Sequence, residues 1–246
     1  MVYESVERLL TLLFPPACCA CGDAGLGRYD ICAPCYRELP RLRLACEICA
    51  EPLPAPASYC GRCLARPPRF HRVRTPYLYA APVDGLVLGL KFNGRLARGR
   101  LLGELLARHL LATGASADLL LPVPLHLSRL RERGFNQAME LARPVAQRLG
   151  IPLSAGTLRR VRRTATQSEL PFRQRGGNVR NAFSVRGRLD DLRIAVVDDV
   201  VTTGNTADAV ARALRAAGAA RVEIWAPARA GRLVAGAPGH RFPAET

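Results

Sequence analysis

Apolar residues in the second half of the chain occur either in short unbroken runs or at helical spacing. Residues 119–121 and 194–197 are continuous apolar runs, which is typical of strands covered on both faces of a parallel sheet. From Asn205 the apolar positions recur at helical spacing as far as Leu214, and Gly218 stands where such a helix would end. The pattern predicts an α/β domain with a parallel sheet and flanking helices.

The segments between these strands follow the same scheme. Residues 83–114 have the spacing of helices. Residues 134–149 ("GFNQAMELARPVAQRL") continue as a helix that accommodates Pro144 with a kink or a break. We therefore assign this α/β domain to residues 77–230, followed by a C-terminal tail at residues 231–246.

The first third of the chain divides into three smaller segments. Residues 1–16 place apolar side chains on one helical face, and Glu4 and Glu7 stand where a secretory signal would be basic, so we expect a packed N-terminal helix. Residues 17–66 are rich in cysteine, and residues 67–76 ("PPRFHRVRTP") have the composition of a linker. Because the chain lacks an apolar run of about 18 residues, we expect a cytoplasmic protein without membrane insertion.

Eight of the nine cysteines form four C-x-x-C pairs, and ten residues separate each pair from the next. Two such pairs supply a tetrahedral shell of four thiolates, so the spacing predicts two structural zinc sites. Consecutive pairing closes the shorter loops and is expected over an interleaved arrangement. Cys19 is left over. The expected ligands are Cys18, Cys21, Cys32 and Cys35 in one site, and Cys46, Cys49, Cys60 and Cys63 in the other.

The formal net charge is +16, and Lys91 is the only lysine, so arginine carries nearly all of the positive charge. Such a balance suits polyanions, including nucleotides, diphosphates and nucleic acid. The alternative is a general preference for arginine at solvated positions. Charge alone therefore admits an anionic ligand without naming it.

Two adjacent acids, Asp198 and Asp199, follow the apolar run at residues 194–197 and precede a loop rich in threonine. Ligands of parallel sheets bind beyond the carboxyl ends of strands, and the start of the next helix attracts phosphate. Two carboxylates at the exposed end of a strand can accept hydrogen bonds from a vicinal diol, so the pattern predicts a ribose 5-phosphate unit. The alternative is a solvated strand end followed by a capped helix. The loop residues are Thr202, Thr203, Gly204, Asn205 and Thr206.

A basic segment at residues 158–183 contains seven arginines and few apolar residues. Long segments of this kind inside compact domains are usually lids or binding loops. If diphosphate leaves an anomeric carbon, cationic side chains such as Arg160 and Arg163 would stabilise the developing charge. We expect a catalytic hood here, the alternative being a passive basic loop.

The string "IAVVDDVVTTGNT" resembles the signature of type I phosphoribosyltransferases, which bind 5-phosphoribosyl 1-diphosphate (PRPP). The resemblance implies a Rossmann-like parallel sheet with flanking helices and a hood. It places Asp198 and Asp199 on the ribose hydroxyls and residues 202–206 around the 5-phosphate. It also implies that the loop containing Val123 and Pro124 contacts the diphosphate, and that Mg²⁺ accompanies PRPP.

Two further strings, "PVPLHLSRLRERGFNQA" and "LRRVRRTATQSEL", narrow the resemblance to the ComF-type branch of this superfamily. Members carry a small cysteine-rich zinc ribbon before the phosphoribosyltransferase domain, and they are implicated in DNA uptake during natural transformation. Single-stranded DNA and a DNA-uptake helicase are the partners that this resemblance implies. It also implies candidate pocket residues, which are Arg133, Asn136, Gln137, Thr164, Gln167 and Asn178.

Three functions are compatible with these patterns. The first is a PRPP-dependent pentosyltransferase, in which the arginines receive the leaving charge. The second is a protein that handles single-stranded DNA through its zinc ribbons and basic surface, and the third is a PRPP sensor without catalysis. The acid pair and the phosphate loop favour PRPP binding in all three cases, and they do not distinguish catalysis from binding alone. The residues expected to act in catalysis are Asp198, Asp199, Arg133, Arg160 and Arg163.

Overall fold

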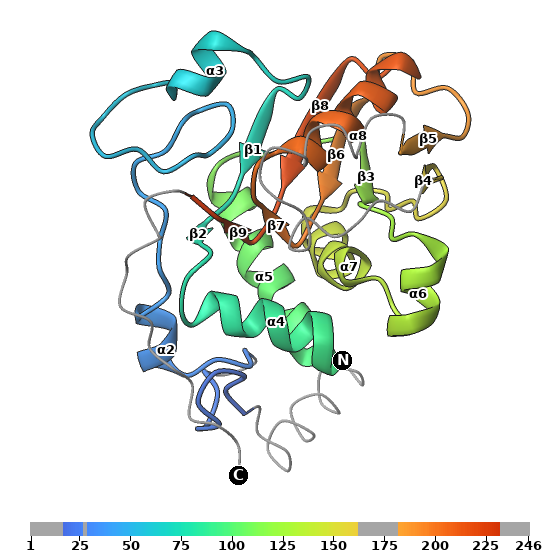
Figure 1. The fold of residues 1–246 in the computed structure, drawn as a ribbon. Helices are drawn as coiled ribbons and strands as arrows, with labels where there is room; N and C mark the ends of the chain where they lie inside the picture. The colour runs from blue at the N-terminus through green and yellow to red at the C-terminus, as the bar shows by residue number, and fades with distance from the viewer. Residues whose placement is uncertain (1–16, 27–28, 162–181, 232–246) are drawn as a thin grey trace.

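The centre of the α/β domain is a four-stranded parallel sheet. The computed structural model describes residues 17–26, 29–161 and 182–231. The strand order is β1-β8-β6-β3, and every neighbouring pair in it runs parallel (Figure 1). The strands are β1 (Arg72–Arg74), β3 (Leu119–Pro122), β6 (Arg193–Val197) and β8 (Arg221–Trp225).

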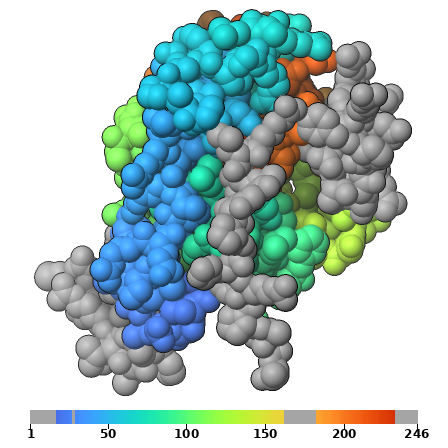
Figure 2. All heavy atoms as spheres, turned by 60° about the vertical axis from the view of Figure 1, so that its left-hand side comes forward, coloured from blue at the N-terminus to red at the C-terminus, as the bar shows by residue number. Residues whose placement is uncertain are grey.

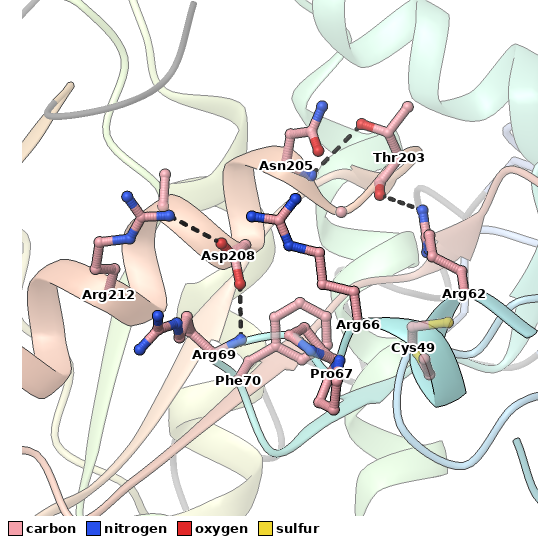
Figure 3. A pocket seen from close by; sticks show the side chains of 14 residues that line it. Cys49, Arg62, Arg66, Pro67, Arg69, Phe70, Thr203, Asn205, Asp208 and Arg212 are labelled. Carbon is pink, nitrogen blue, oxygen red and sulfur yellow. Dashed lines mark hydrogen bonds and ion pairs between the residues drawn. The ribbon is translucent and has the colours of Figure 1, made fainter. Parts of the chain in front are cut away.

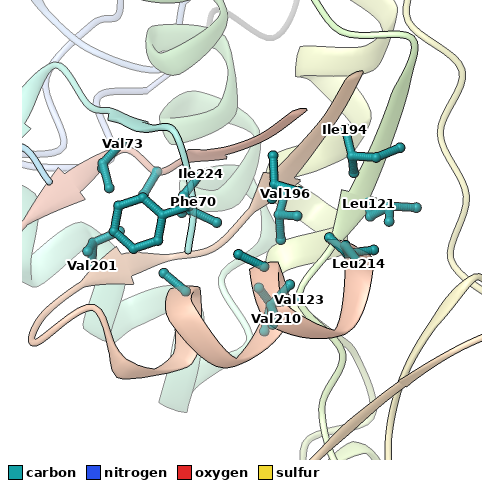
Figure 4. Close-up of a cluster of buried hydrophobic side chains, with 14 of the residues drawn as sticks. Phe70, Val73, Leu121, Val123, Ile194, Val196, Val201, Val210, Leu214 and Ile224 are labelled. Atoms are coloured by element: carbon teal, nitrogen blue, oxygen red, sulfur yellow. The ribbon is translucent and has the colours of Figure 1, made fainter. Parts of the chain in front are cut away.

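Alternate residues of β6 face opposite layers of the domain. Ile194 and Val196 belong to the apolar cluster that includes Val210 of α8 (Figure 4). Ala195 and Val197 belong to the cluster formed with α4, α5 and α7. Both faces of the sheet are therefore covered, which confirms the α/β fold and explains the unbroken apolar run of β6. The helices are α4 (Val83–Asn93), α5 (Leu96–Ala112), α7 (Gln137–Leu149) and α8 (Asn205–Ala216).

Residues 67–76, expected to be a linker, contain the edge strand β1, so that expectation is wrong for this part of the chain. Val73 is buried in β1, and Phe70 just before it is buried as well. Arg74 Nε lies 2.7 Å from a carboxylate oxygen of Glu223 in β8. A three-residue strand with arginine on both sides of its single apolar residue is too short to show the alternation of apolar and polar residues that predicts a strand. Pairing with β8 and the buried ion pair place it in the sheet.

The proline within α7 does not end that helix. Pro144 is buried against α5, where an added Cβ on Gly103 would lie 2.4 Å from Pro144 Cγ. The missing side chain of Gly103 therefore leaves the space that the proline ring occupies. The close approach of α5 and α7 keeps α7 continuous. Of the kink and the break expected at Pro144, the break does not occur.

Smaller elements frame the ends of the main strands. The expected hood segment starts in β4 and ends in β5, and these two strands pair antiparallel. Residues 162–181 lie outside the described residues, as do the predicted N-terminal helix and the C-terminal tail from residue 232. The smaller elements are β4 (Leu158–Arg160), β5 (Phe183–Val185), α6 (Leu127–Arg133) and a three-stranded parallel sheet of β2 (Tyr77–Leu78), β9 (Ala228–Arg229) and β7 (Val200–Val201).

The two cysteine-rich ribbons pack on different parts of the α/β domain. The first includes α2 (Ala33–Arg37), and its buried Ile31 joins the cluster of α4 and α5. The second includes α3 (Gly61–Ala65), and its cysteines join the cluster of α8. Figure 2 shows the ribbons, blue to cyan, as one column along a face of the molecule. Within the described part of the chain, no helix has both the length and the apolar character needed to cross a membrane.

Candidate active site and metal centres

The eight spaced cysteines converge into two separate sets. Within each set the Sγ atoms all lie within 4.8 Å of one another. The Sγ atoms of Cys21 and Cys32 are 3.6 Å apart, as are those of Cys49 and Cys60. Zinc–sulfur bonds of about 2.3 Å in a tetrahedron place sulfurs about 3.8 Å apart, so both sets fit a zinc ion. The sets are Cys18, Cys21, Cys32 and Cys35, and Cys46, Cys49, Cys60 and Cys63, which confirms the consecutive pairing.

One thiol in each set is prepared for ionisation. Burial opposes ionisation of Cys18 and Cys46, but backbone N–H groups donate to both sulfurs and lower each pKa to about 7. Cys19 differs, because burial and the nearby carboxylate of Asp30 raise its pKa to about 11. Burial also raises the pKa of Cys35 and Cys63, which belong to the two sets, so the convergence of the Sγ atoms, and not thiol acidity, separates the sets from Cys19.

Substitutions of cysteine distinguish the two sets from Cys19. We expect the purified protein to hold about two zinc ions, because each four-thiolate set fits one. Cys19→Ser should leave this content unchanged, and Cys32→Ser should remove one ion. Metal analysis of the three proteins measures both effects. A single ion in the wild-type protein, or two ions in the Cys32→Ser protein, would contradict the assignment.

The two acids at the end of β6 have different surroundings. Asp198 is half-buried, whereas Asp199 is only 6% exposed. The Nζ atom of Lys91 lies 3.0 Å from Asp199 Oδ1, and Gln137 Nε2 donates to Asp199 Oδ2 at 2.9 Å. The expectation that both carboxylates stand at an exposed strand end is therefore wrong for Asp199. Both carboxylate oxygens of Asp199 therefore have partners, and Asp198 is the more exposed of the two acids.

Gln137 leaves one acceptor unsatisfied beside this pair. Its side chain is buried at the first turn of α7, and its Oε1 atom has no hydrogen-bond partner among the described residues. A buried acceptor without a donor costs about 1–3 kcal/mol. A ligand hydroxyl or a metal-bound water would supply the missing donor. The amide is thus suited to a polar ligand next to Asp198.

Asp198 carries a perturbed carboxyl group. Burial raises its pKa to about 7, and repulsion from Asp199 acts in the same direction. Lys91 and Arg160 oppose the shift through their positive charge. Perturbed carboxyl groups concentrate at functional sites, because a ligand can supply the compensation that the protein withholds. Cations and hydrogen-bond donors of a bound ligand would therefore stabilise the ionised form of Asp198.

The loop after the acids has the geometry of an anion site. Gly204 adopts φ of 80°, a left-handed conformation that favours glycine, and it begins α8 without a side-chain cap. The first N–H groups of a helix have no partner within it and attract negative charge. Thr203 and Asn205 flank the glycine, and Thr203 Oγ1 accepts weakly from Asn205 N at 3.4 Å. The loop can therefore bind a phosphate through its amides.

Two arginines fasten this loop to the second cysteine set. Arg62, next to Cys63, donates from Nη1 to Thr203 O at 2.6 Å. Arg229 is fully buried, and its guanidinium donates to Cys49 O and Val201 O, both at 3.0 Å. The second ribbon and the phosphate loop therefore share one hydrogen-bonded network. Further acceptors from Arg229 are the carbonyls of Thr202 and Ala230 and the carboxylate of Glu51.

Asn136 positions the loop after β3. Its Nδ2 donates to Val123 O at 3.1 Å, and its Oδ1 accepts from Ala138 N at 3.0 Å as the cap of α7. Both ends of this side chain are thus used within the protein. Val123 is buried and Pro124 is half-buried, so the loop is held in place for whatever its backbone contacts.

The predicted arginines do not all lie together. Arg160 is half-buried at the end of β4, where it stacks over Phe183 and its charge acts on Asp198. Arg133 stacks over the ring of Phe92 in α4, with its Cζ atom 5.3 Å from the ring centroid, and no described contact joins it to the acids. Four candidates, Arg163, Thr164, Gln167 and Asn178, lie outside the described residues.

Sequence reasoning missed two important cations. Lys91 pairs with Asp199, although nothing in its helical context marks it except that it is the only lysine. Arg229 lies in the otherwise apolar string "WAPARAG", and an arginine in such a string is the signal that could have been followed. Contacts with residues distant in sequence place both cations beside the acid pair and the loop.

The fold and the paired sites define a phosphoribosyltransferase-type domain preceded by a double zinc ribbon. A family model described as double zinc ribbon domain matches residues 9–64, and one described as phosphoribosyl transferase domain matches residues 136–234. Among solved structures, the glutamine PRPP amidotransferase from B. subtilis complexed with ADP and GMP aligns with 26% identity and a TM-score of 0.35. That alignment covers 51% of this chain and 25% of the other.

Curated relatives match nearly the whole chain. DNA utilization protein YhgH of Salmonella typhimurium is 38% identical over 220 residues, covering 87% of this chain and 97% of the relative. Competence protein F of Haemophilus influenzae is 30% identical over 219 residues, covering 85% and 94%. The chain belongs to the family of these proteins.

Proposed function

We propose that the protein binds PRPP at the carboxyl end of β6 and acts as a phosphoribosyltransferase-type protein in DNA utilization. One observation carries the proposal: an anion loop, a half-buried acid and a buried unsatisfied acceptor meet where β6 ends. Asp198 and Gln137 supply the acceptors, and Gly204 opens the loop. A ribose 5-phosphate unit matches all three, because it combines hydroxyl donors with a phosphate.

Each part of the ligand then has its own group of residues. The backbone amides of residues 202–206 take the 5-phosphate. Asp198 and Gln137 Oε1 accept from the ribose hydroxyls, while Asp199 with Lys91 holds the amide of Gln137 in place. The loop at Val123 and Pro124 faces the diphosphate. Arg160, whose charge already acts on Asp198, offsets negative charge on the leaving diphosphate.

The acidic site also suits Mg²⁺. This ion usually binds through one or two carboxylates together with ligand phosphates and retained waters. Asp198 is the carboxylate that would hold it, since both oxygens of Asp199 already have partners. Bound Mg²⁺ would neutralise diphosphate charge. The protein itself contributes the orientation of the ribose.

Calorimetric titration with PRPP and Mg²⁺ tests the binding step, and we expect saturable binding to one site. Transfer breaks the bond from the ribose C1 to diphosphate and forms a bond from C1 to an acceptor. Pyrophosphate release is therefore measured with PRPP alone and with nucleobases or single-stranded DNA added. Binding without release would leave a PRPP sensor, and the absence of binding would overturn the proposal.

A second candidate function is single-stranded DNA binding. The observations that favour it are the net charge of +16 and the names of the relatives, which refer to DNA utilization and competence. DNA affinity built on several phosphate contacts falls steeply with salt because counterions are released. The arginines of both ribbons and of α8 would supply these contacts.

Salt separates the two candidates quantitatively. Between about 50 and 200 mM salt we expect DNA affinity to fall more than about tenfold, and PRPP affinity with saturating Mg²⁺ to fall less than about threefold. Fluorescence anisotropy with a labelled oligonucleotide and calorimetry with PRPP measure the two dependences. DNA binding that ignores salt would argue against a phosphate-dominated DNA interface.

A further inference from the structure

A pocket of about 530 Å³ lies between the end of the second ribbon and the start of α8. It is outside the acid pair, since neither Asp198 nor Asp199 lines it. Three residues of the phosphate loop form part of its wall, namely Thr203, Gly204 and Asn205. Four arginines also line it, and Figure 3 shows their side chains around the loop. These arginines are Arg62, Arg66, Arg69 and Arg212.

Four arginines line the pocket together with one carboxylate and two thiolates of the second cysteine set, Cys49 and Cys63. Four thiolates around one Zn²⁺ carry a net charge of about −2, and the arginines still leave an excess of positive charge. Asp208, the only carboxylate in the lining, accepts from Arg212 Nη2 at 3.2 Å and from the backbone N of Arg69 at 2.7 Å. Arg62 is engaged with Thr203 O. Neither the guanidinium of Arg66 nor that of Arg69 has a hydrogen-bond or ion-pair partner among the described residues. Donors for an anion are therefore available.

The lining favours phosphate over a nucleobase. Phe70 is the one aromatic residue among those lining the pocket, and it is only 5% exposed. It therefore offers little face on which a base could stack. Guanidinium groups, in contrast, bind phosphate through paired hydrogen bonds of fixed geometry. The pocket's donors thus match phosphate oxygens.

Continuity with the phosphate loop determines which phosphate this is. A 5-phosphate on the amides of residues 202–206 lies at the pocket wall, because the same loop lines the pocket. Arg62 Nη1 lies 2.6 Å from the loop carbonyl of Thr203, so a guanidinium already stands beside the loop. A second phosphate joined directly to the first would project among the arginines.

We propose that this arginine pocket is a second phosphate subsite, which takes the β-phosphate of a ribonucleoside 5′-diphosphate whose ribose 5-phosphate occupies the loop. The assignment rests on the proposed ribose 5-phosphate site. PRPP carries a single phosphate at its 5-position and therefore cannot fill this subsite. A ribonucleoside 5′-diphosphate is a ligand class beyond PRPP. Asp198 would still accept from a ribose hydroxyl. AMP and ADP have the same ribose, so they differ only in the β-phosphate that the subsite would bind.

Calorimetric titrations with AMP, ADP and PRPP, at one ionic strength with Mg²⁺, test the subsite. We expect wild-type protein to bind ADP at least about tenfold more tightly than AMP, as paired hydrogen bonds from two free guanidinium groups imply. In Arg66→Gln/Arg69→Gln the preference should fall below about threefold. The control, Arg37→Gln/Arg215→Gln, removes the same charge from exposed arginines outside the pocket and should keep the preference.

Each outcome decides a stated point. Equal affinity for ADP and AMP in a wild-type protein that binds PRPP overturns the subsite and leaves the PRPP proposal standing. Binding of neither PRPP nor AMP overturns both. An undiminished preference in the double variant, confirmed as folded by its zinc content and thermal melting, also overturns the subsite. Tighter binding of the 5′-phosphorylated dinucleotide pApA than of ADP assigns the pocket to a nucleic-acid strand and overturns the diphosphate assignment.

Discussion

Replacing Asp198 with asparagine is expected to abolish most PRPP binding and, at the same time, to stabilise the ligand-free protein above pH 7. Asparagine is nearly isosteric but neutral, so it loses the charge-assisted hydrogen bond to a ribose hydroxyl and the negative charge that would hold Mg²⁺. Their loss should weaken PRPP affinity at least about a hundredfold. Calorimetry with PRPP and Mg²⁺ on both proteins measures this change.

The gain in stability follows from the raised pKa of Asp198, which moves from 3.8 to about 7 through burial and repulsion from Asp199. A group whose pKa is raised on folding contributes its full stability below the unfolded value and loses it as pH rises through the folded value. Between about pH 4 and pH 7 the unfolded chain loses this proton while the folded protein keeps it, so stability falls across this window and stays reduced above about pH 7. Asp198→Asn should raise the free energy of unfolding above pH 7 by roughly 2–4 kcal/mol. Urea denaturation at about pH 4 and pH 8 should show the larger gain at pH 8.

Asp199→Asn is the matched control, because the same change one residue away should have the opposite effect on stability. It leaves Lys91 partly buried without its counter-charge and should cost roughly 2–3 kcal/mol. If Asp198→Asn binds PRPP like the wild type, Asp198 is not the ribose acceptor. If Asp198→Asn is less stable than the wild type at pH 8, ionised Asp198 does not destabilise the ligand-free protein.

Loss of the second cysteine set is expected to impair PRPP binding, whereas loss of the first should not. Cys60→Ser removes a ligand from the set whose knuckle is fastened to the phosphate loop through Arg229 and Arg62. Without zinc this knuckle loses much of its folding free energy. We expect PRPP affinity to fall more than about tenfold, because the loop must then be ordered by the ligand itself.

Cys32→Ser provides the comparison within the same chain. It should also lose one zinc ion, but its set packs with α4 and α5 in the other apolar cluster, away from α8. We expect its PRPP affinity to stay within about threefold of the wild type. Metal analysis, calorimetry and hydrogen exchange of residues 200–206 test the difference. Equal PRPP affinities in the two variants would show that the hydrogen bonds of Arg229 and Arg62 do not couple metal to loop.

Local patterns predicted most of the fold and of the metal sites. The unbroken apolar run of β6 is by itself enough to predict a strand covered on both faces, and the structure covers both faces. The cysteine spacing likewise suffices, since two C-x-x-C pairs close short loops around one ion. The acid pair and the phosphate loop could be located because strand, loop and helix are contiguous in the chain. Each of these signals lies within a few tens of residues.

Contacts between distant segments decided the rest. Residues 67–76 are too short and too charged to be recognised as a strand, and only pairing with β8 and the ion pair to Glu223 place β1 in the sheet. Asp198 and Asp199 have the same side chain and adjacent positions, yet Lys91 of α4 balances the charge of Asp199 and Gln137 of α7 donates a hydrogen bond to it, while Asp198 has neither contact. A charge's effect depends on its neighbours and on its burial, and folding brings both from elsewhere in the chain. The sequence by itself therefore determined the chemistry available at the site, and the tertiary structure determined which acid is available to a ligand and which ribbon touches the phosphate loop.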